Sequence, residues 1–268
     1  CSKMKNRVKK LKTEFKENKG KIIIYLLLRV LIILCLILQV IRGEYENVLL
    51  CLLTLILLFL PFIIEHKLKI DLPNTLEIII MIFVFSAEIL GEVNNFYGII
   101  PFWDTILHTL NGFLMAAIGF SLFDILNDKL KSIQLSSIYL CLFSFCFSMT
   151  VGVIWEFFEY GMDKTFNYDM QKDEYINEIY TTKLDNNNKV VSIDDIKYTV
   201  LYDKNNKQLV NLNGYLDIGL NDTMKDLIVN FIGAIIFNIF GYAYLKNRKN
   251  GNSLIPAAAG FSAAGTQR

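Results

Sequence analysis

The chain has 268 residues, of which 53% are hydrophobic and 20% are charged, with a formal net charge of +1. This apolar share is high for a soluble domain, and the even charge balance gives no indication of binding to nucleic acid. Six mostly apolar stretches of roughly 18 residues or more could each cross a bilayer core of about 30 Å as a helix. They are Ile22–Ile41, Val48–Ile64, Leu76–Val93, Trp103–Phe123, Leu135–Trp155 and Asp222–Leu245.

Positive charge is concentrated in alternate connecting segments. Residues 1–21 hold nine Lys or Arg, and further cations lie after the second span, after the fourth span and in the tail. By the positive-inside rule, we expect both termini in the cytoplasm and residues 161–221 outside. Residues 1–21 and 246–268 are then cytoplasmic, and residues 22–160 and 222–245 are transmembrane. A composition heavy in Ile, Lys and Asn is compatible with a low-GC bacterial source, so we expect the location to be a bacterial cell membrane. Cys1–Lys3 and residues 256–268 read as cloning or tag remnants.

The first two spans carry few polar groups. Arg29, deep in the first span, is expected to extend toward the cytoplasm or to pair with Glu77. The second span is expected to stop near Pro61, and the third to begin after an Asn-Thr cap at residues 74–75.

The segment between the fifth and sixth spans has a different composition. Residues 163–185 are acidic and could be partly helical. Short β-type runs at Val190–Ile193, Tyr198–Tyr202 and Gln208–Leu212 alternate with Asn/Asp turns. We therefore expect a small extracytoplasmic α/β or β-rich insert on an all-α bundle of six helices.

Polar side chains form stripes on four of the spans. A helix turns about 100° per residue, so Asp104, His108 and Asn111 share one face of the fourth span. The other three spans carry equivalent stripes, made up of Glu88, Glu92 and Asn95; Glu156 and Glu159; and Asp222, Asp226 and Asn230. With the topology above, all of these ionisable groups lie within roughly 10 Å of the outer surface.

Seven carboxylates and one imidazole at a shared depth would repel one another unless a cation, shared protons or water separates them. Asp, Glu and His ligands suit Mg²⁺, Mn²⁺, Ca²⁺ or a catalytic Zn²⁺. We expect His108, Glu156, Asp222 and Asp226 to bind the metal, with His108, Glu156 and Asp226 as the catalytic candidates. The expected supporting or substrate-binding residues are Asp104, which would orient His108, and Asn111, Glu88, Glu92, Glu159, Asp217 and Asn230.

Structural explanations compete with this interpretation. Asp104 and Asp222 begin inward-going spans, where an acidic side chain caps a helix and is favoured by its dipole. Capping does not explain His108 and Asp226, which lie one turn deeper.

Three segments resemble a known family. "FWDTILHTLNGF", "GVIWEFFEYGMD" and "GYLDIGLNDTMKDLIVNFIGA" are similar to the YjdF-like bacterial inner-membrane proteins and, more distantly, to VanZ-like proteins. The residues matching the shared pattern are Asp104, His108, Gly112, Glu156, Asp217, Asp222, Asp226 and Gly233. The long outer insertion departs from the compact pattern. The resemblance implies the importance of these residues but no reaction; the VanZ-like branch implies a role at the cell envelope.

Three functions remain open. The first is an outward-facing cation site that acts on an envelope or lipid-linked substrate, whether as an enzyme or not. The second is an ion- or proton-coupled transporter or exporter that uses the acids as a relay. The third is a non-catalytic envelope protein that binds a partner through its insert. Membrane lipid is the expected surrounding partner in each case.

Overall fold

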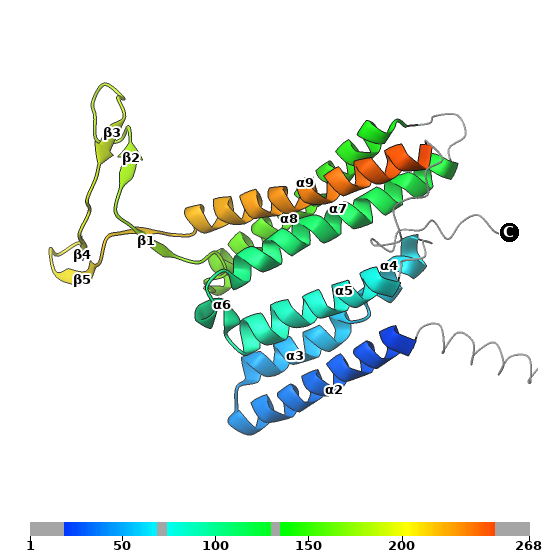
Figure 1. The fold of residues 1–268 in the computed structure, drawn as a ribbon. Coiled ribbons are helices and arrows are strands. Elements are labelled where there is room, and N and C mark those ends of the chain that lie inside the picture. The colour runs from blue at the N-terminus through cyan, green and yellow to red at the C-terminus, as the bar shows by residue number, and fades with distance from the viewer. Residues whose placement is uncertain (1–18, 69–73, 130–134, 250–268) are drawn as a thin grey trace, which may run out of the picture.

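The computed structural model describes residues 19–68, 74–129 and 135–249 (Figure 1). The basic N-terminal stretch up to residue 18 and the tail from residue 250 lie outside the described residues, as do their expected cloning remnants. The helices are α2 (Lys19–Arg42), α3 (Tyr45–Leu57), α4 (Leu60–Leu68), α5 (Asn74–Phe85), the π-helical η1 (Ser86–Val93), α6 (Phe96–Ile99), α7 (Trp103–Lys129), α8 (Ser137–Phe166) and α9 (Leu220–Lys249).

Several of these helices are membrane spans by length and composition. Within the described residues, α2, α7, α8 and α9 are long and apolar enough to cross a bilayer. The pair α3 and α4 adds a fifth span if its 41° bend is counted within one segment. The chain is therefore a multi-pass membrane protein with four or five such spans. The third stretch expected from the sequence is covered by α5 and η1, which follow each other without a break.

Pro61 bends the second span instead of ending it. Proline has no N–H to donate to the carbonyl of Leu57, the last residue of α3, and its ring crowds that carbonyl. The helix is interrupted there and resumes as α4 in a new direction. A helix therefore ends near Pro61, as expected, but helical structure continues after the break in α4 to Leu68.

The helices α7, α8 and α9 pack into one unit. Their shared core contains Ala116, Phe120, Leu140, Ala234 and Phe237, all less than 9% exposed. The helices α7 and α9 approach closely at Gly112. Only a residue without a Cβ atom fits there, since a Cβ atom would collide with the backbone oxygen of Asn230.

A second group of helices, α2, α3 and α5 with η1, lies beside this unit (Figure 1). Leu76, Ile80 and Val84 of α5 join the two groups by packing against Leu114 and Ile118 of α7. Much of α2 is exposed apolar surface, with Leu26, Val30 and Leu34 more than half exposed. Such a surface suits contact with lipid tails.

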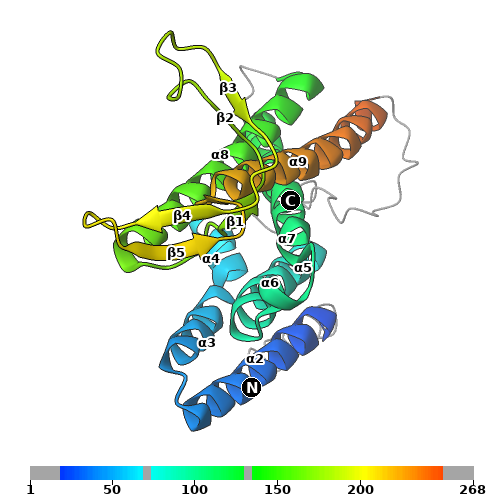
Figure 2. The same ribbon diagram turned by 90° about the vertical axis from the view of Figure 1, so that its left-hand side faces the viewer.

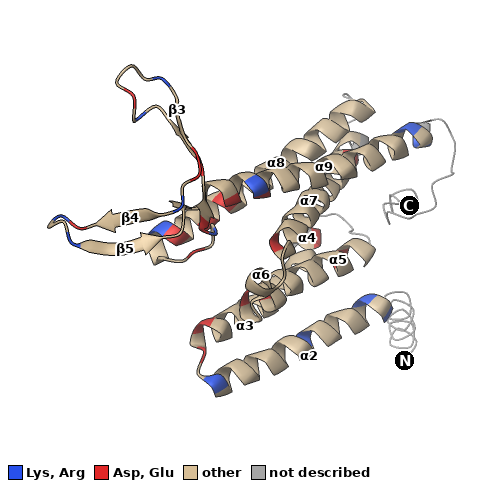
Figure 3. Cartoon of the chain, turned by 60° about the vertical axis from the view of Figure 1, so that its left-hand side comes forward, with Lys and Arg blue, Asp and Glu red and all other residues tan. Residues whose placement is uncertain are grey.

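All elements that carry the sequence-predicted stripes meet at one end of the bundle. Figure 1 shows η1, the starts of α7 and α9 and the end of α8 on the same side, with α7 and α9 parallel and α8 antiparallel to them. Figure 3 shows acidic residues gathered where α9 begins, while the middle of the helices is almost free of charge. The expected depth match between the stripes thus follows from the helix directions.

The insert between α8 and α9 leaves this same end of the bundle. Its strands are β1 (Glu174–Ile176), β2 (Ile179–Thr181), β3 (Val191–Ile193), β4 (Thr199–Tyr202), β5 (Gln208–Leu212) and β6 (Tyr215–Asp217). They form three antiparallel pairs, β1–β6, β2–β3 and β4–β5. Figure 1 shows the insert extending beyond the helices, and Figure 2 shows the β2–β3 and β4–β5 pairs pointing in different directions.

The three β-type runs seen in the sequence became β3, β4 and β5. The expected partial helix over residues 163–185 is confirmed only to Phe166, where α8 ends, and β1 and β2 follow. Asn167 is left-handed, with φ of 57°, and Asp163 accepts hydrogen bonds from the backbone N–H groups of Met170 and Gln171. This local turn ends the helix.

Glu77 pairs with a different cation from the one expected. Lys21 Nζ lies 2.6 Å from Glu77 Oε1, since both sit near the same end of their helices. Arg29 stacks instead over the rings of Tyr25 and Phe59, at 4.6 and 4.3 Å from their centroids. Of the two alternatives given for Arg29, the pair with Glu77 is therefore wrong.

Candidate functional site

The site is centred on the imidazole of His108. His108 Nε2 lies 3.4 Å from Asp104 Oδ1, one turn earlier on α7, and 3.7 Å from Asp226 Oδ2 on α9. Ligand atoms of the three residues all lie within 4.8 Å of one another. Asp226 is 1% exposed, and the side chain of His108 is 12% exposed. We refer to Asp104, His108 and Asp226 as the triad.

The other nitrogen of His108 faces α8. Nδ1 lies 4.0 Å from Glu156 Oε1, so a carboxylate stands on each side of the ring. Two buried oxygens, Glu156 Oε2 and Asp226 Oδ1, have no hydrogen-bond partner within the described structure. A buried carboxylate oxygen without a partner is costly, so both oxygens are positioned to accept a proton, a water or a cation.

Helix directions help to explain why acids gather here. Asp104 and Asp226 lie in the first two turns of α7 and α9, which begin at the same end of the bundle. The N-terminal end of a helix carries a partial positive charge that favours a carboxylate. This field stabilises both acids but does not supply partners for their remaining oxygens.

A polar contact one turn deeper locks the helices together. Asn111 Nδ2 donates to Asn230 Oδ1 at 3.1 Å, and Asn230 Nδ2 contacts Met149 Sδ on α8 at 3.6 Å. Ser148 of α8 donates to the carbonyl of Gly112 at 2.7 Å. These contacts place the faces of α7, α8 and α9 that carry the triad and Glu156 in fixed register.

Asp222, expected as a metal ligand, has another partner. Its Oδ2 accepts a hydrogen bond from the backbone N–H of Lys172 at 2.8 Å. The neighbouring Gln171 donates to Thr223 Oγ1 at 2.5 Å, and Asp163 binds the preceding backbone. Residues 167–173, which we call the strap, are thereby tied to the start of α9 beside the triad.

The remaining predicted residues surround the triad at greater distance. Glu159 is buried and accepts a hydrogen bond from Trp155 Nε1 at 2.8 Å. Glu92 on η1 is close enough to interact electrostatically with Asp104 and Lys172, and Glu88 interacts with Glu92. Asp217 lies at the base of the insert, where it accepts a hydrogen bond from the backbone N–H of Asn221 and caps α9.

Sequence reasoning missed the residues that hold the strap. Asp163, Gln171 and Thr223 belong to no stripe. The one signal for the turn in the sequence is Asn167, a residue type that accepts the left-handed backbone found there, after an apolar helical segment. It also missed Tyr97 on α6, whose ring would collide with a Cβ atom on Gly91 and which lies within electrostatic reach of Asp104.

The triad has the dimensions of a cation site. Metal–ligand bonds of about 2.0–2.2 Å place the ligand atoms of a tetrahedral site roughly 3.4 Å apart. The two His108 Nε2 distances, 3.4 and 3.7 Å, are close to this separation. Imidazole with two carboxylates is a donor set that Zn²⁺ or Mn²⁺ accepts. The triad is therefore a candidate cation site.

These features define a class of protein: a multi-pass helical membrane protein with a buried Asp/His/Asp group at one end of its bundle. Residues 23–247 match the model of the DUF2238 family, described as predicted membrane proteins, and the chain belongs to that family. It is also similar to an uncharacterized protein of Thermotoga maritima, with 30% identity over 121 residues, which are 42% of this chain and 58% of the relative. The chain thus spans a little over half of that relative's length. No solved structure matches the chain.

Proposed function

We propose that the protein binds a divalent cation at the triad and uses it on an envelope or lipid-linked substrate at the outer face of the bacterial membrane. The observation that carries the proposal is the unpartnered Asp226 Oδ1, which is buried beside an imidazole and a second acid. A cation would compensate these charges and supply the missing interactions.

The geometry favours a division of roles between the residues around His108. The Nε2 side faces both aspartates and would bind the cation with them. Glu156 on the Nδ1 side would hold the imidazole in the ligating tautomer, as carboxylates commonly do for metal-bound histidine. In an enzymatic form, a bound Zn²⁺ or Mn²⁺ would activate water for hydrolysis.

The assignment to the outer face rests on charge distribution. The start of α2 and the end of α9, which adjoin the basic N-terminal stretch and tail of the sequence, lie at the end of the bundle opposite the triad. Under the positive-inside rule the triad would then face outward and the termini would face the cytoplasm. Six spans, with α5 and η1 as the third, are consistent with this arrangement. The distant resemblance of the motifs to VanZ-like proteins, which implies a role at the cell envelope, also favours the proposal.

A transporter using the same acids is less well supported. Toward the other end of the bundle, the buried residues between α7, α8 and α9 are mainly apolar, including Ala116, Phe120 and Phe237. The charged residues Asp124 and Arg248 near that end form a two-bonded ion pair with each other. A relay across the membrane would need polar groups in between.

Metal analysis of the purified protein tests the proposal. Protein stripped with EDTA, then dialysed against Zn²⁺ or Mn²⁺ and desalted, is expected to retain about one ion per chain. Asp226→Asn and His108→Ala should each lose it. Asp124→Asn is the matched control, since it makes the same change on a partly buried acid outside the site. Equal metal retention in all four proteins would contradict the proposal.

A further inference from the structure

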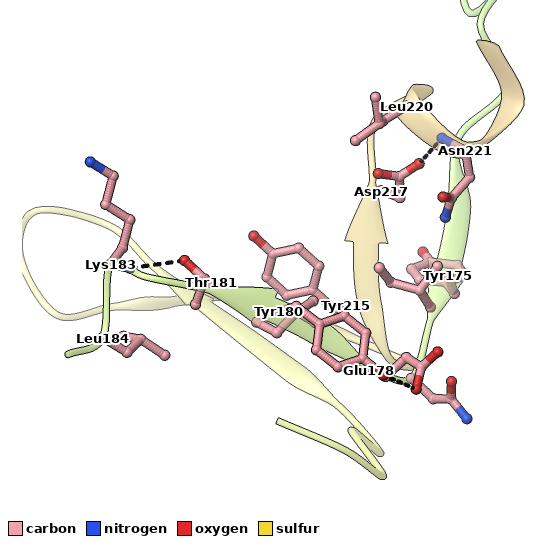
Figure 4. A pocket seen from close by; sticks show the side chains of 13 residues that line it. Tyr175, Glu178, Tyr180, Thr181, Lys183, Leu184, Tyr215, Asp217, Leu220 and Asn221 are labelled. Carbon is pink, nitrogen blue, oxygen red and sulfur yellow. Dashed lines mark hydrogen bonds between the residues drawn. The ribbon is translucent and has the colours of Figure 1, made fainter. Parts of the chain in front are cut away.

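A cavity of about 890 Å³ lies at the base of the insert, outside the helical bundle (Figure 4). Residues of β1, β2 and β6 form its walls, together with Leu220 and Asn221 at the start of α9. Its volume is within the range of small-molecule sites in proteins, about 300–1,000 Å³. The triad and Glu156 do not contribute to it, so it is a second candidate site.

Three tyrosines line the cavity. Tyr175, Tyr180 and Tyr215 are 58, 64 and 42% exposed, so none of them is a core residue of the insert. Tyr180 Oη donates a hydrogen bond to Glu178 Oε2 at 3.0 Å. Exposed aromatic rings around a cavity offer flat apolar faces to a ligand.

Polar groups stand between these rings. Glu178 and Asp217 provide carboxylate oxygens, Asn221 provides an amide, and Lys183 is the cation among the lining residues. Ile176, Ile179, Leu184 and Leu220 add apolar surface to the lining, and its two acids against one lysine do not favour a phosphate. Flat apolar faces alternating with hydrogen-bonding groups complement a molecule that is itself made of C–H faces and hydroxyl edges.

We propose that this cavity binds the sugar rings of a saccharide. The tyrosine rings would pack against the C–H faces of the sugars, while Glu178, Asp217 and Asn221 would bind their hydroxyl groups. The inference deepens the proposed function and rests on it for one point, namely that the saccharide is part of the substrate used at the triad. The two sites are near each other along the chain, because Asn221 precedes Asp226 by about 7.5 Å of α9.

Binding of two trisaccharides, tri-N-acetylchitotriose and maltotriose, tests the cavity directly. The full chain is placed in phospholipid nanodiscs free of sugar-based detergents, and binding is followed by saturation-transfer NMR and calorimetry. The wild type should bind at least one probe saturably. Tyr180→Ala and Tyr215→Ala should each weaken binding by about threefold to tenfold, the usual effect of one aromatic contact. Tyr180→Phe keeps the ring and should stay close to wild type.

Tyr202→Ala is the matched control, since Tyr202 is a 59% exposed tyrosine of the same insert on β4 and does not line the cavity. The inference is overturned if the wild type binds neither probe, or if Tyr202→Ala weakens binding as much as Tyr180→Ala. Metal content is measured on the same samples. If Asp226→Asn still binds the saccharide, the cavity works without the metal site. If Tyr180→Ala still retains metal, the metal site works without the cavity. Failure of this inference can then be distinguished from failure of the proposed function.

Discussion

His108 on α7 and Asp226 on α9 meet inside the bundle, with His108 Nε2 3.7 Å from Asp226 Oδ2. Asp104 approaches the same nitrogen, whereas Glu156 approaches the opposite one. An imidazole between three carboxylates, with two carboxylate oxygens left without partners, is an arrangement that a cation would complete. Packing between α7, α8 and α9 holds these groups in place, so the predictions below address both that packing and the site itself.

Alanine at Gly112 or Gly233 should separate α7 from α9. Added Cβ atoms would collide with the backbone oxygens of Asn230 and Thr109, respectively, and backbone cannot move aside as a flexible side chain can. Overpacking of this kind costs about 1–3 kcal/mol. Gly161 is the control, because a Cβ atom there meets nothing within 4 Å. Thermal unfolding in detergent should show a clear loss for the first two variants and none for Gly161→Ala.

Replacing Asn230 by alanine should also destabilise the bundle. Asn230 is 1% exposed and bonds to Asn111, so its removal leaves a buried amide unpaired and a small void. The expected cost is about 1–3 kcal/mol. Asn221→Ala, an exposed change on the same helix, should stay within about 0.5 kcal/mol. Unfolding of both variants to the same extent would mean that the Asn111–Asn230 contact does not hold the helices.

The strap should loosen when Asp222 is replaced by alanine. The backbone N–H of Lys172 then loses its partner, and one such bond is worth about 0.5–1.5 kcal/mol. Trypsin should cleave after Lys172 roughly threefold to tenfold faster, because cleavage follows local opening. Asp203→Ala, which removes equivalent backbone bonds in the β4–β5 turn, should leave cleavage after Lys172 unchanged.

The orientation of the chain can be measured by cysteine labelling. In a background with the native cysteines replaced by alanine, Asn205→Cys in the insert should react with a membrane-impermeant maleimide in intact cells. Gly20→Cys, at the start of α2, should react only after the membrane is opened. Both positions are exposed. The reverse pattern would place the triad on the cytoplasmic side and remove the basis for an envelope substrate.

The sequence predicted the general position of the site because two simple regularities determine it. The helical repeat places Asp104 and His108 on one face of α7, and alternating helix directions bring the polar ends of four segments to one side. Apolar composition identified four of the six expected spans, α2, α7, α8 and α9, and a fifth if α3 and α4 are counted as one bent segment; within the described residues, α5 and η1 do not meet the same criterion.

The sequence could not predict which partner each polar side chain contacts, because this depends on how the helices are rotated against one another. From the sequence, Glu77 on α5 could pair with either Arg29 or Lys21 on α2. In the structure Arg29 stacks over the rings of Tyr25 and Phe59, and Lys21 pairs with Glu77. In the same way, the stripe on α9 treats Asp222 and Asp226 as equivalent. Only the fold of the strap shows that Asp222 is held by backbone, leaving Asp226 to face His108.

The most direct test of the cation site is anomalous scattering from protein loaded with Zn²⁺ or Mn²⁺, recorded at the absorption edge of the metal. The account predicts one strong peak about 2.0–2.2 Å from His108 Nε2 and from carboxylate oxygens of Asp104 and Asp226. Saturating metal with no anomalous peak between α7 and α9, or with His108 turned away from Asp226, would contradict it.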